Sequence, residues 1–482
     1  MDEEQPTPEP AVPAADDGSP AEAAPAAESN AAPAPANDPE PPRSRRRLRI
    51  AVALTLVAAI ALLAAIQASG LLGTIAHSPT EPAPTRIAVV NAAGALSTMD
   101  VLGGNVFAHP LAGVSFVFPA WSPDGTRIAA IGGATDDGAV YVIQARGENA
   151  SDPTAATAPT VIYRSPDHPA FYAYWTPDGR QVTFLTQEPD QLALRVAPAD
   201  ASTPAVVIRE GNPLYWDWAD PARALVNVGG GGPGAFLGEI GLDGVAGTPT
   251  AATPGAFRSP AVTHDGTHRA FVVAGAAGST SIVLESRAGA DRHEIPVPGM
   301  AAVSFAPAGD TLAFIAPEAP GPPIGLPIGP LRVVDVASGS VRTLLSGSIV
   351  GFFWSPDGKT IATLRIPGPG DDDVASVGNA VPAIDFPPAA ATSGYTLHLA
   401  FVDVASGSVR SSREVRVSQR FALELLPYFD QYALSHRFWS PDSASFMLPL
   451  VSEEDVVGIV LLPPDGSNER RVVVGEMGSF SP

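Results

Sequence analysis

Cysteine is absent from the 482 residues of this sequence, and lysine occurs once, at Lys359. Without cysteine, no disulfide bond or thiolate metal site can stabilise the chain, so the fold must rest on packing alone. The 28 lysines and arginines are outnumbered by 50 acidic residues, which gives a formal net charge of −22. Because binding to a phosphate backbone requires clustered basic side chains, we expect no nucleic-acid partner.

Proline and glycine are abundant, with 52 and 46 residues, and hydrophobic residues make up 45% of the chain. Proline and glycine are typical of tight turns and interrupt helices. The hydrophobic fraction is large enough for a sizeable core. This composition favours a fold of many short strands joined by turns.

The first 76 residues divide into a polar tail and one hydrophobic segment. Residues 1–42 consist mainly of Ala, Pro, Glu and Asp, a composition that cannot bury enough apolar surface to fold. Five arginines follow between residues 43 and 49, and an uncharged apolar run begins at Ile50. Since about 20 apolar residues span a bilayer, residues 48–76 are predicted to form one transmembrane helix.

The arginines also predict an orientation, because positively charged flanks stay on the cytoplasmic side of a membrane. Residues 1–47 would then be a disordered cytoplasmic tail with a basic end, and 77–85 a Pro-rich linker. The protein is therefore expected in the cytoplasmic membrane as a single-pass protein, with everything after about His77 outside. Alternatives are a signal peptide cleaved near Ala76 and a twin-arginine signal, to which Arg49 is poorly suited.

From residue 86 onward one pattern recurs: an aromatic residue, then Ser-Pro-Asp-Gly or a variant, then an apolar strand. Proline presets the first corner of a turn, aspartate bonds the local backbone, and glycine accepts a positive φ. Each copy therefore predicts the turn between the first two strands of a four-stranded repeat. The residues expected to have this structural role are Trp121, Asp124, Trp175, Asp178, Trp218, Phe305, Trp354, Asp357, Trp439, Asp442 and, at the C-terminus, Phe480.

Residues 86–482 are thus predicted to form an all-β propeller that is closed by its own termini. Segments 86–91, 96–101 and 106–110 supply three strands with no aromatic strand before them, and 477–482 supplies an aromatic strand and no more. One composite blade from these two ends, added to seven internal copies, gives eight four-stranded blades. Seven blades is the alternative, if the weak copy around Trp218 is not a full blade.

The Trp-Ser-Pro-Asp-Gly motif followed by an apolar strand resembles the repeat of TolB-type β-propellers, over nearly all of residues 86–482. The resemblance implies a propeller fold and a bacterial, membrane-anchored member of this group. Similar folds include the periplasmic Tol-system protein, the propeller domains of prolyl oligopeptidases and many bacterial envelope proteins. Because fold does not determine function, the resemblance implies no activity.

Known catalytic and metal-binding patterns do not fit this sequence. No Gly-x-Ser-x-Gly elbow lies between a strand and a helix. His264 and His268 flank a predicted turn, Asp371-Asp372-Asp373 matches no calcium loop, and no Lys-Ser/Thr follows Gly229–Gly232. We therefore predict no catalytic residues, no metal site and no cofactor.

The longest departure from the repeat is the interval of 85 residues between Trp354 and Trp439. Apolar residues at helical spacing from Phe421 to Tyr432 predict a short amphipathic helix over one face of the ring, broken near Pro427. The polar and aromatic residues of this segment would lie near the channel mouth, where ligands often bind. The candidate ligand- or partner-binding residues are Tyr428, Asp430, Gln431, Tyr432, His436 and Arg437. The alternative is that this segment only packs.

These features together predict a non-catalytic, extracytoplasmic binding or scaffold propeller that engages an envelope protein, a peptide or a glycan. An exported hydrolase or lyase that uses the propeller channel is one alternative, and a solute-sensing domain is another. An enzyme would require His, Asp, Glu or Tyr side chains that converge in the channel. A scaffold would require an apolar or aromatic patch on one face.

Overall fold

The computed structural model describes residues 85–482, except for residues 134–137, 147–157, 230–233, 251–252, 277–278, 321–325 and 368–393. All described residues belong to the compact unit Ala83–Pro482. The predicted tail at 1–47, the helix at 48–76 and nearly all of the linker at 77–85 lie outside the described residues, as do Asp371–Asp373. Among the described residues, no helix is both long and apolar enough to cross a membrane.

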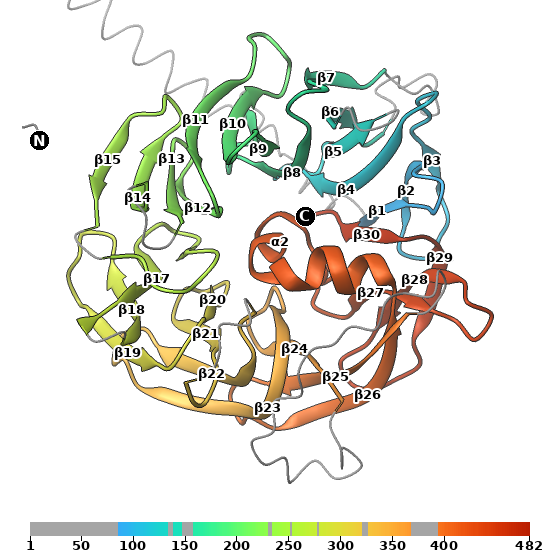
Figure 1. Ribbon diagram of the computed structural model, residues 1–482. Coiled ribbons are helices and arrows are strands. Elements are labelled where there is room, and N and C mark those ends of the chain that lie inside the picture. The colour runs from blue at the N-terminus through green and yellow to red at the C-terminus, as the bar shows by residue number, and fades with distance from the viewer. Residues whose placement is uncertain are drawn as a thin grey trace, which may run out of the picture. The chain divides into compact units, whose positions relative to one another are not determined.

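Antiparallel sheets follow one another around a ring (Figure 1). The first sheet joins the two ends of the folded unit, with the strand order β3-β2-β1-β30. Its strands are β1 (Arg86–Val90), β2 (Leu96–Asp100), β3 (Phe107–Ala108) and β30 (Met477–Phe480). Ile87 is paired with Phe480 and Val90 with Met477. The predicted closure of the ring by the C-terminal strand is confirmed.

Four further sheets have four strands each, and every one runs in sequence order from the inside of the ring to its outside. The sheet that contains Trp218 is one of them, so this weak copy of the motif forms a complete sheet. Their strands are β4 (Ser115–Trp121), β5 (Arg127–Gly133), β6 (Ala139–Gln144) and β7 (Thr160–Tyr163); β8 (Ala170–Trp175), β9 (Gln181–Gln187), β10 (Leu192–Pro198) and β11 (Val206–Gly211); β12 (Leu214–Asp220), β13 (Arg223–Val228), β14 (Phe236–Gly241) and β15 (Ala246–Pro249); β16 (Ala261–Val262), β17 (His268–Ala274), β18 (Thr280–Ser286) and β19 (His293–Val297).

The rest of the ring is one continuous sheet of ten strands, β20 to β29. It is continuous because the 14-residue strand β23 pairs with β22 through its first part and with β24 through its second part, and because β26 pairs with β27 through Val417 and Leu450. The strands are β20 (Ala302–Phe305), β21 (Thr311–Ile315), β22 (Gly329–Asp335), β23 (Val341–Trp354), β24 (Thr360–Arg365), β25 (Tyr395–Asp403), β26 (Val409–Val417), β27 (Phe446–Val451), β28 (Val457–Leu462) and β29 (Arg470–Val474).

The turns of the repeat have the predicted chemistry. At the first clear copy, the Ser122 hydroxyl donates to Asp124 Oδ1 at 2.5 Å, and the same oxygen accepts the Thr126 N–H at 3.0 Å. Gly125 has a φ of 68°, which a glycine adopts without strain. Hydroxyl-to-aspartate bonds of 2.5 to 2.6 Å recur at Asp178, Asp357 and Asp442. The turn is thus held by groups within five residues of one another.

The motif tryptophans pack between neighbouring sheets and also form a hydrogen bond that the sequence did not predict. At four of the five motif tryptophans, the indole N–H donates to the carbonyl of the residue just before the aromatic anchor of the preceding sheet, whereas the buried indole N–H of Trp218 has no hydrogen-bond partner among the described residues. The bonds join Trp121 to Ser479 (3.0 Å), Trp175 to Ala120 (2.9 Å), Trp354 to Ser304 (3.2 Å) and Trp439 to Phe353 (3.1 Å). Because Ser479 precedes Phe480, the C-terminal phenylalanine occupies the anchor position of its sheet, as predicted.

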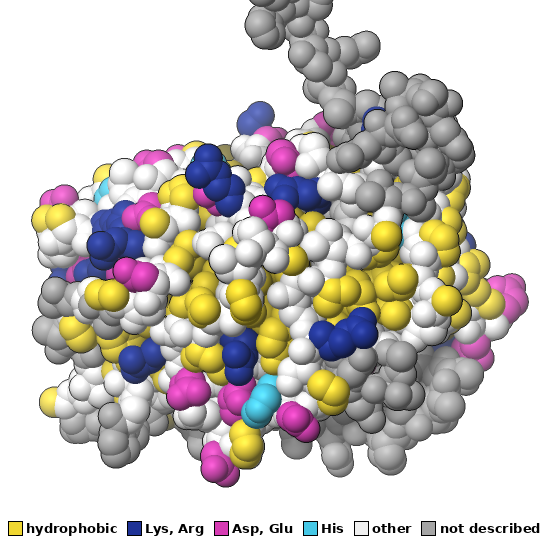
Figure 2. Space-filling model, turned by 90° about the horizontal axis from the view of Figure 1, so that it is seen from above, with side chains coloured by type: hydrophobic (Ala, Val, Ile, Leu, Met, Phe, Trp, Pro, Cys, Tyr) yellow, Lys and Arg dark blue, Asp and Glu magenta, His cyan; other side chains and the backbone are white. Residues whose placement is uncertain are grey.

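The outer edge of the ring carries hydrophobic side chains among charged ones, and Figure 2 shows them gathered across one side. Val206 on the outer strand β11 is 52% exposed, and Val161 on β7 is also exposed. The sheets are otherwise packed face to face by buried aliphatic and aromatic residues. The inner strands β4, β8, β12, β16 and β20 surround the centre, where the candidate site lies.

Candidate functional site

Residues 421–435 form three short helical pieces at the centre of the ring (Figure 1). They are the π-helix η2 (Phe421–Leu425), the 3-10 helix η3 (Leu426–Tyr428) and the α-helix α2 (Phe429–Ser435). Pro427 lies in the middle piece, so the predicted break near Pro427 is confirmed. We call residues 420–437 the insertion.

The insertion extends into the ring, whereas the sequence predicted that it would lie over one face. Helix α2 contacts the inner strands β8, β12, β20 and β23, which come from different parts of the ring. These contacts bury the four consecutive residues from Phe429 to Tyr432, and Phe429 is only 1% exposed. The apolar spacing predicted helical structure in this segment, but α2 does not have one apolar and one polar face, because Asp430 and Gln431 are buried together with Phe429 and Tyr432.

Gln431 fastens α2 to the inner strand β12. Its Oε1 accepts the backbone N–H of Trp216 at 3.1 Å, and its Nε2 donates to the Trp216 carbonyl at 3.0 Å. The Tyr172 hydroxyl, which donates to the Gln431 backbone carbonyl at 2.9 Å, lies 3.2 Å from Nε2. The side-chain amide of Gln431 thus bonds to both the backbone N–H and the backbone carbonyl of Trp216. Its hydrogen-bonding groups are occupied by bonds within the protein.

Asp430 and Arg258 hold the beginning of α2. Asp430 is 3% exposed, and its Oδ2 accepts the Ser259 N–H at 3.0 Å, whereas its Oδ1 has no hydrogen-bond partner among the described residues. Burial raises the pKa of Asp430, an effect that the nearby Arg258 opposes. Arg258 also donates to the Pro427 carbonyl, and its guanidinium stacks 4.7 Å above the Tyr428 ring.

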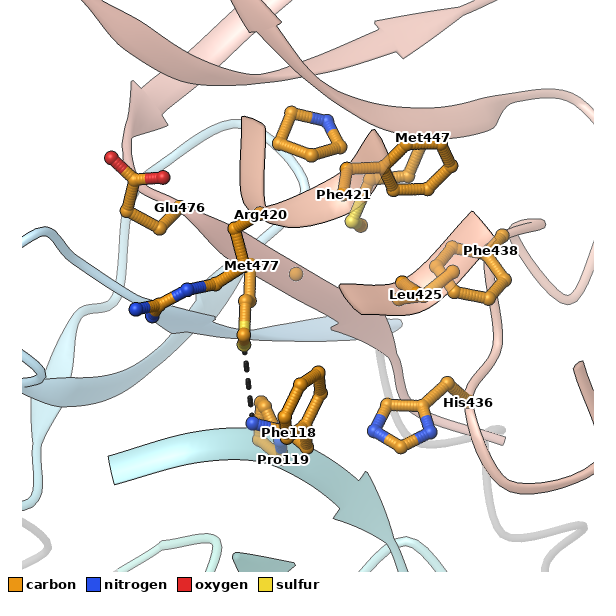
Figure 3. Close-up of a pocket in the computed structure, with 12 residues that line it drawn as sticks. Phe118, Pro119, Arg420, Phe421, Leu425, His436, Phe438, Met447, Glu476 and Met477 are labelled. Carbon is orange, nitrogen blue, oxygen red and sulfur yellow. Dashed lines mark hydrogen bonds between the residues drawn. The ribbon is translucent and has the colours of Figure 1, made fainter. Parts of the chain in front are cut away.

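Tyr432 and His436 pack against Phe118 of β4, with ring centroids 5.1 Å and 6.4 Å away. Phe118 has a φ of 51° at a β-bulge, and its N–H points to the sulfur of Met477 at 3.1 Å, the dashed line in Figure 3. A cavity of about 20 Å³ lies here, lined by His436 and mostly by apolar side chains such as Leu425. Such a volume holds about one water molecule, so it is too small for a substrate.

The six candidate residues therefore separate into two groups. Asp430, Gln431, Tyr432 and His436 are buried, and they pack as the alternative interpretation predicted. Tyr428 is 43% exposed, and Arg437 is also exposed. The sequence did not identify the residues that bind this buried group, because they belong to other repeats. They are Tyr172, Trp216, Arg258 and Ser259. One signal was available: alternate tyrosines in the inner strand Ala170–Trp175 point toward the centre.

Of the other candidates from the sequence, His264 and His268 are among the described residues. His268 Nδ1 lies 2.9 Å from the hydroxyl of its neighbour Thr267. In the described part of the chain, no three metal-ligating side chains come together. Gly229 is described, with a φ of 40°, but the rest of Gly229–Gly232 is not.

Replacing His436 by phenylalanine should remove a pH-dependent loss of stability. Burial lowers the pKa of His436 to about 4, from 6.5. The folded protein therefore binds this proton less readily than the unfolded chain, and stability falls as the pH drops from 6.5 toward 4. The difference of about 2.5 pKa units corresponds to about 3 kcal/mol. Urea unfolding of the wild type and of His436→Phe at pH 7 and pH 4 measures this difference in the free energy of unfolding. An equal loss of stability at pH 4 in the two proteins would contradict the prediction.

Comparisons with known proteins address the fold. No protein-family model matches the sequence, and no curated protein matches it. Among solved structures, dihydro-heme d1 dehydrogenase NirN is similar with a TM-score of 0.50 and 13% identity, over 83% of this chain and 75% of that chain. NirN is a β-propeller. So is this ring.

Two other propellers are less similar to this one. AztD from Citrobacter koseri is 13% identical over 82% of this chain and 96% of its own, with a TM-score of 0.46. TolB from Acinetobacter baumannii is 14% identical over 83% of both chains, with a TM-score of 0.35. The predicted propeller fold is confirmed, and at these identities the similarities concern the fold alone. A closer relation to TolB stays a prediction.

Proposed function

We propose that this protein is a non-catalytic binding propeller, held at the outer face of the cytoplasmic membrane by residues 48–76. It would engage an envelope protein, a peptide or a glycan. The supporting observation is that the ring holds its insertion rigidly through Gln431, Asp430 and Arg258. Polar groups at the centre are thereby used to position the insertion.

The rigid insertion leaves two large apolar side chains in solvent, Tyr428 at 43% and Leu423 at 37% exposed. Arg258 stacks on the Tyr428 ring and so restricts it before any partner arrives. Tyrosines that are ordered in advance lose little conformational entropy on binding and are frequent binding hot spots. This exposed part of the insertion is the surface at which we expect the partner.

We also propose that the ring has eight blades. Five sheets are separate and four-stranded. The ten-stranded sheet divides at β23 and again before β27, where the bridge between Trp439 and Phe446 supplies an inner strand. The three resulting blades added to five make eight, and the sheet around Trp218 is complete.

Crosslinking in intact membranes followed by purification of the full-length protein tests this proposal. We expect a partner that is recovered with the wild type and is reduced several-fold by Tyr428→Ala combined with Leu423→Ser, since hot-spot residues carry most of the binding energy. Val206→Ser is the matched control, because it changes an even more exposed apolar side chain, on the outer strand β11. Recovery of no partner, or equal recovery with all variants, would contradict the proposal.

A further inference from the structure

The chain enters the ring at one end of the closing sheet. Arg86, the first residue of β1, is paired with Asp100 at the end of β2, and its guanidinium donates to the Asn105 carbonyl at 3.1 Å. Its backbone N–H donates to the hydroxyl of Ser481 at 3.0 Å. The connection between β2 and β3 therefore lies beside the point at which residues 77–85 join the ring.

This connection presents two apolar side chains to solvent, Leu102 at 71% and Val106 at 59% exposed. Its backbone is held in place by the Asp100 carboxylate. Oδ1 accepts the N–H groups of Leu102 at 2.9 Å and Gly104 at 2.8 Å, and Oδ2 accepts the side-chain amide of Asn105 at 2.7 Å. Apolar side chains on a loop ordered in this way lose little conformational entropy when another surface covers them.

Equivalent connections of the other sheets lie on the same face of the ring. Strands alternate in direction within each sheet, so the connection from the third to the fourth strand is at the same end as the Ser-Pro-Asp-Gly turn. Turns of neighbouring sheets lie side by side, with Gly179 against Pro123 and Gly125 against Pro482. We call the face that contains these turns and Arg86 the turn face.

The turn face carries most of the highly exposed apolar side chains. Among the described residues, six large apolar side chains are at least 46% exposed, and five of these lie in or beside connections on this face. The five are Leu102, Val106, Val206, Val245 and Val341. The sixth, Val474, lies on the opposite face: two residues later, the N–H of Glu476 donates to the carbonyl of Val90, at the other end of β1 from Arg86.

We propose that the turn face contacts the lipid headgroup region of the membrane, with Leu102 and Val106 as the main contacts. This contact rests on the proposed function, in which residues 48–76 span that membrane. The nine residues 77–85 then separate the bilayer from β1, and a chain of that length reaches at most about 30 Å. The boundary between headgroups and acyl chains takes up apolar side chains that are brought to it.

The contact is apolar, because the net charge of −22 opposes attraction to anionic headgroups. Two exposed side chains are enough, since the tether raises the effective concentration of the ring at the membrane. The insertion begins on the opposite face, where Phe421 lines a cavity with Met477, the residue that pairs with Val90. A ring held in this way turns the beginning of the insertion away from the bilayer.

Fluorescence quenching in vesicles tests the contact with the full-length protein. Because the chain has no cysteine, Leu102→Cys and Val106→Cys each carry a single NBD fluorophore. The vesicles consist of phosphatidylethanolamine and phosphatidylglycerol and contain a lipid with a nitroxide near its headgroup. We expect quenching several-fold stronger at these two positions than at Val474→Cys, the matched control, which places the same label at an exposed apolar position on the opposite face. High salt should leave the quenching unchanged.

Flotation of the vesicles distinguishes a failure of this contact from a failure of the proposed function. Protein that does not float with the vesicles would overturn the anchor, and the lipid contact with it. Protein that floats but shows equal quenching at Leu102→Cys and Val474→Cys would overturn the lipid contact alone. Shielding of the label at Leu102→Cys from iodide in native membranes, but not in the vesicles, would assign the turn face to a protein partner and would also overturn it.

Discussion

A protein that lacks residues 477–482 is expected to lose its closed ring and to aggregate. Deletion of β30 exposes the edge of β1, and unpaired strand edges invite pairing between molecules. It also removes Phe480, which is 0% exposed, and the carbonyl of Ser479 that accepts the Trp121 indole N–H. The single change Phe480→Ala should already lower the free energy of unfolding by about 3 to 5 kcal/mol.

Denaturant unfolding and size-exclusion chromatography measure both effects in the full-length protein. Deletion of Pro482 alone is the control, because this residue is exposed and lies outside β30. Val474→Ala is a second control, since Val474 is 54% exposed on the outer strand β29. A monomeric, fully stable protein without residues 477–482 would show that closure by the termini contributes little.

Replacing Gln431 by leucine should detach the insertion from the ring and destabilise the fold by about 3 to 5 kcal/mol. The leucine has a similar volume but leaves the N–H and the carbonyl of Trp216 buried without a partner, as well as one bond of Tyr172. Each unsatisfied buried group costs about 1 to 3 kcal/mol. Because Trp216 is 0% exposed, water cannot readily replace the lost bonds.

Urea unfolding and limited proteolysis within residues 420–437 report this change. Gln187→Leu is the matched control, since the same substitution there affects an exposed side chain that is bonded only to nearby loop carbonyls. Its effect should stay within about 0.5 kcal/mol, as for most surface positions. A protein with Gln431→Leu and unchanged stability would mean that hydrophobic packing of Phe429 and Tyr432 alone retains the insertion.

The sequence by itself determined the repeat, its turns and the closure of the ring. The information for a turn is local: Ser122, Asp124 and Gly125 supply the donor, the acceptor and the positive φ within five residues. The closing strand was predictable because residues 477–482 and the strands after residue 85 are incomplete repeats that complement each other.

Only the tertiary structure decided what the insertion does. The groups that bind Asp430 and Gln431 are 171 and 215 residues away in the chain, so no local pattern in residues 420–437 distinguishes a ligand site from a packed core. The contact between Phe118, which lies at a bulge of β4, and Tyr432 is equally non-local. Burial by distant strands took four of the six candidate residues out of solvent and left Tyr428 and Arg437 exposed.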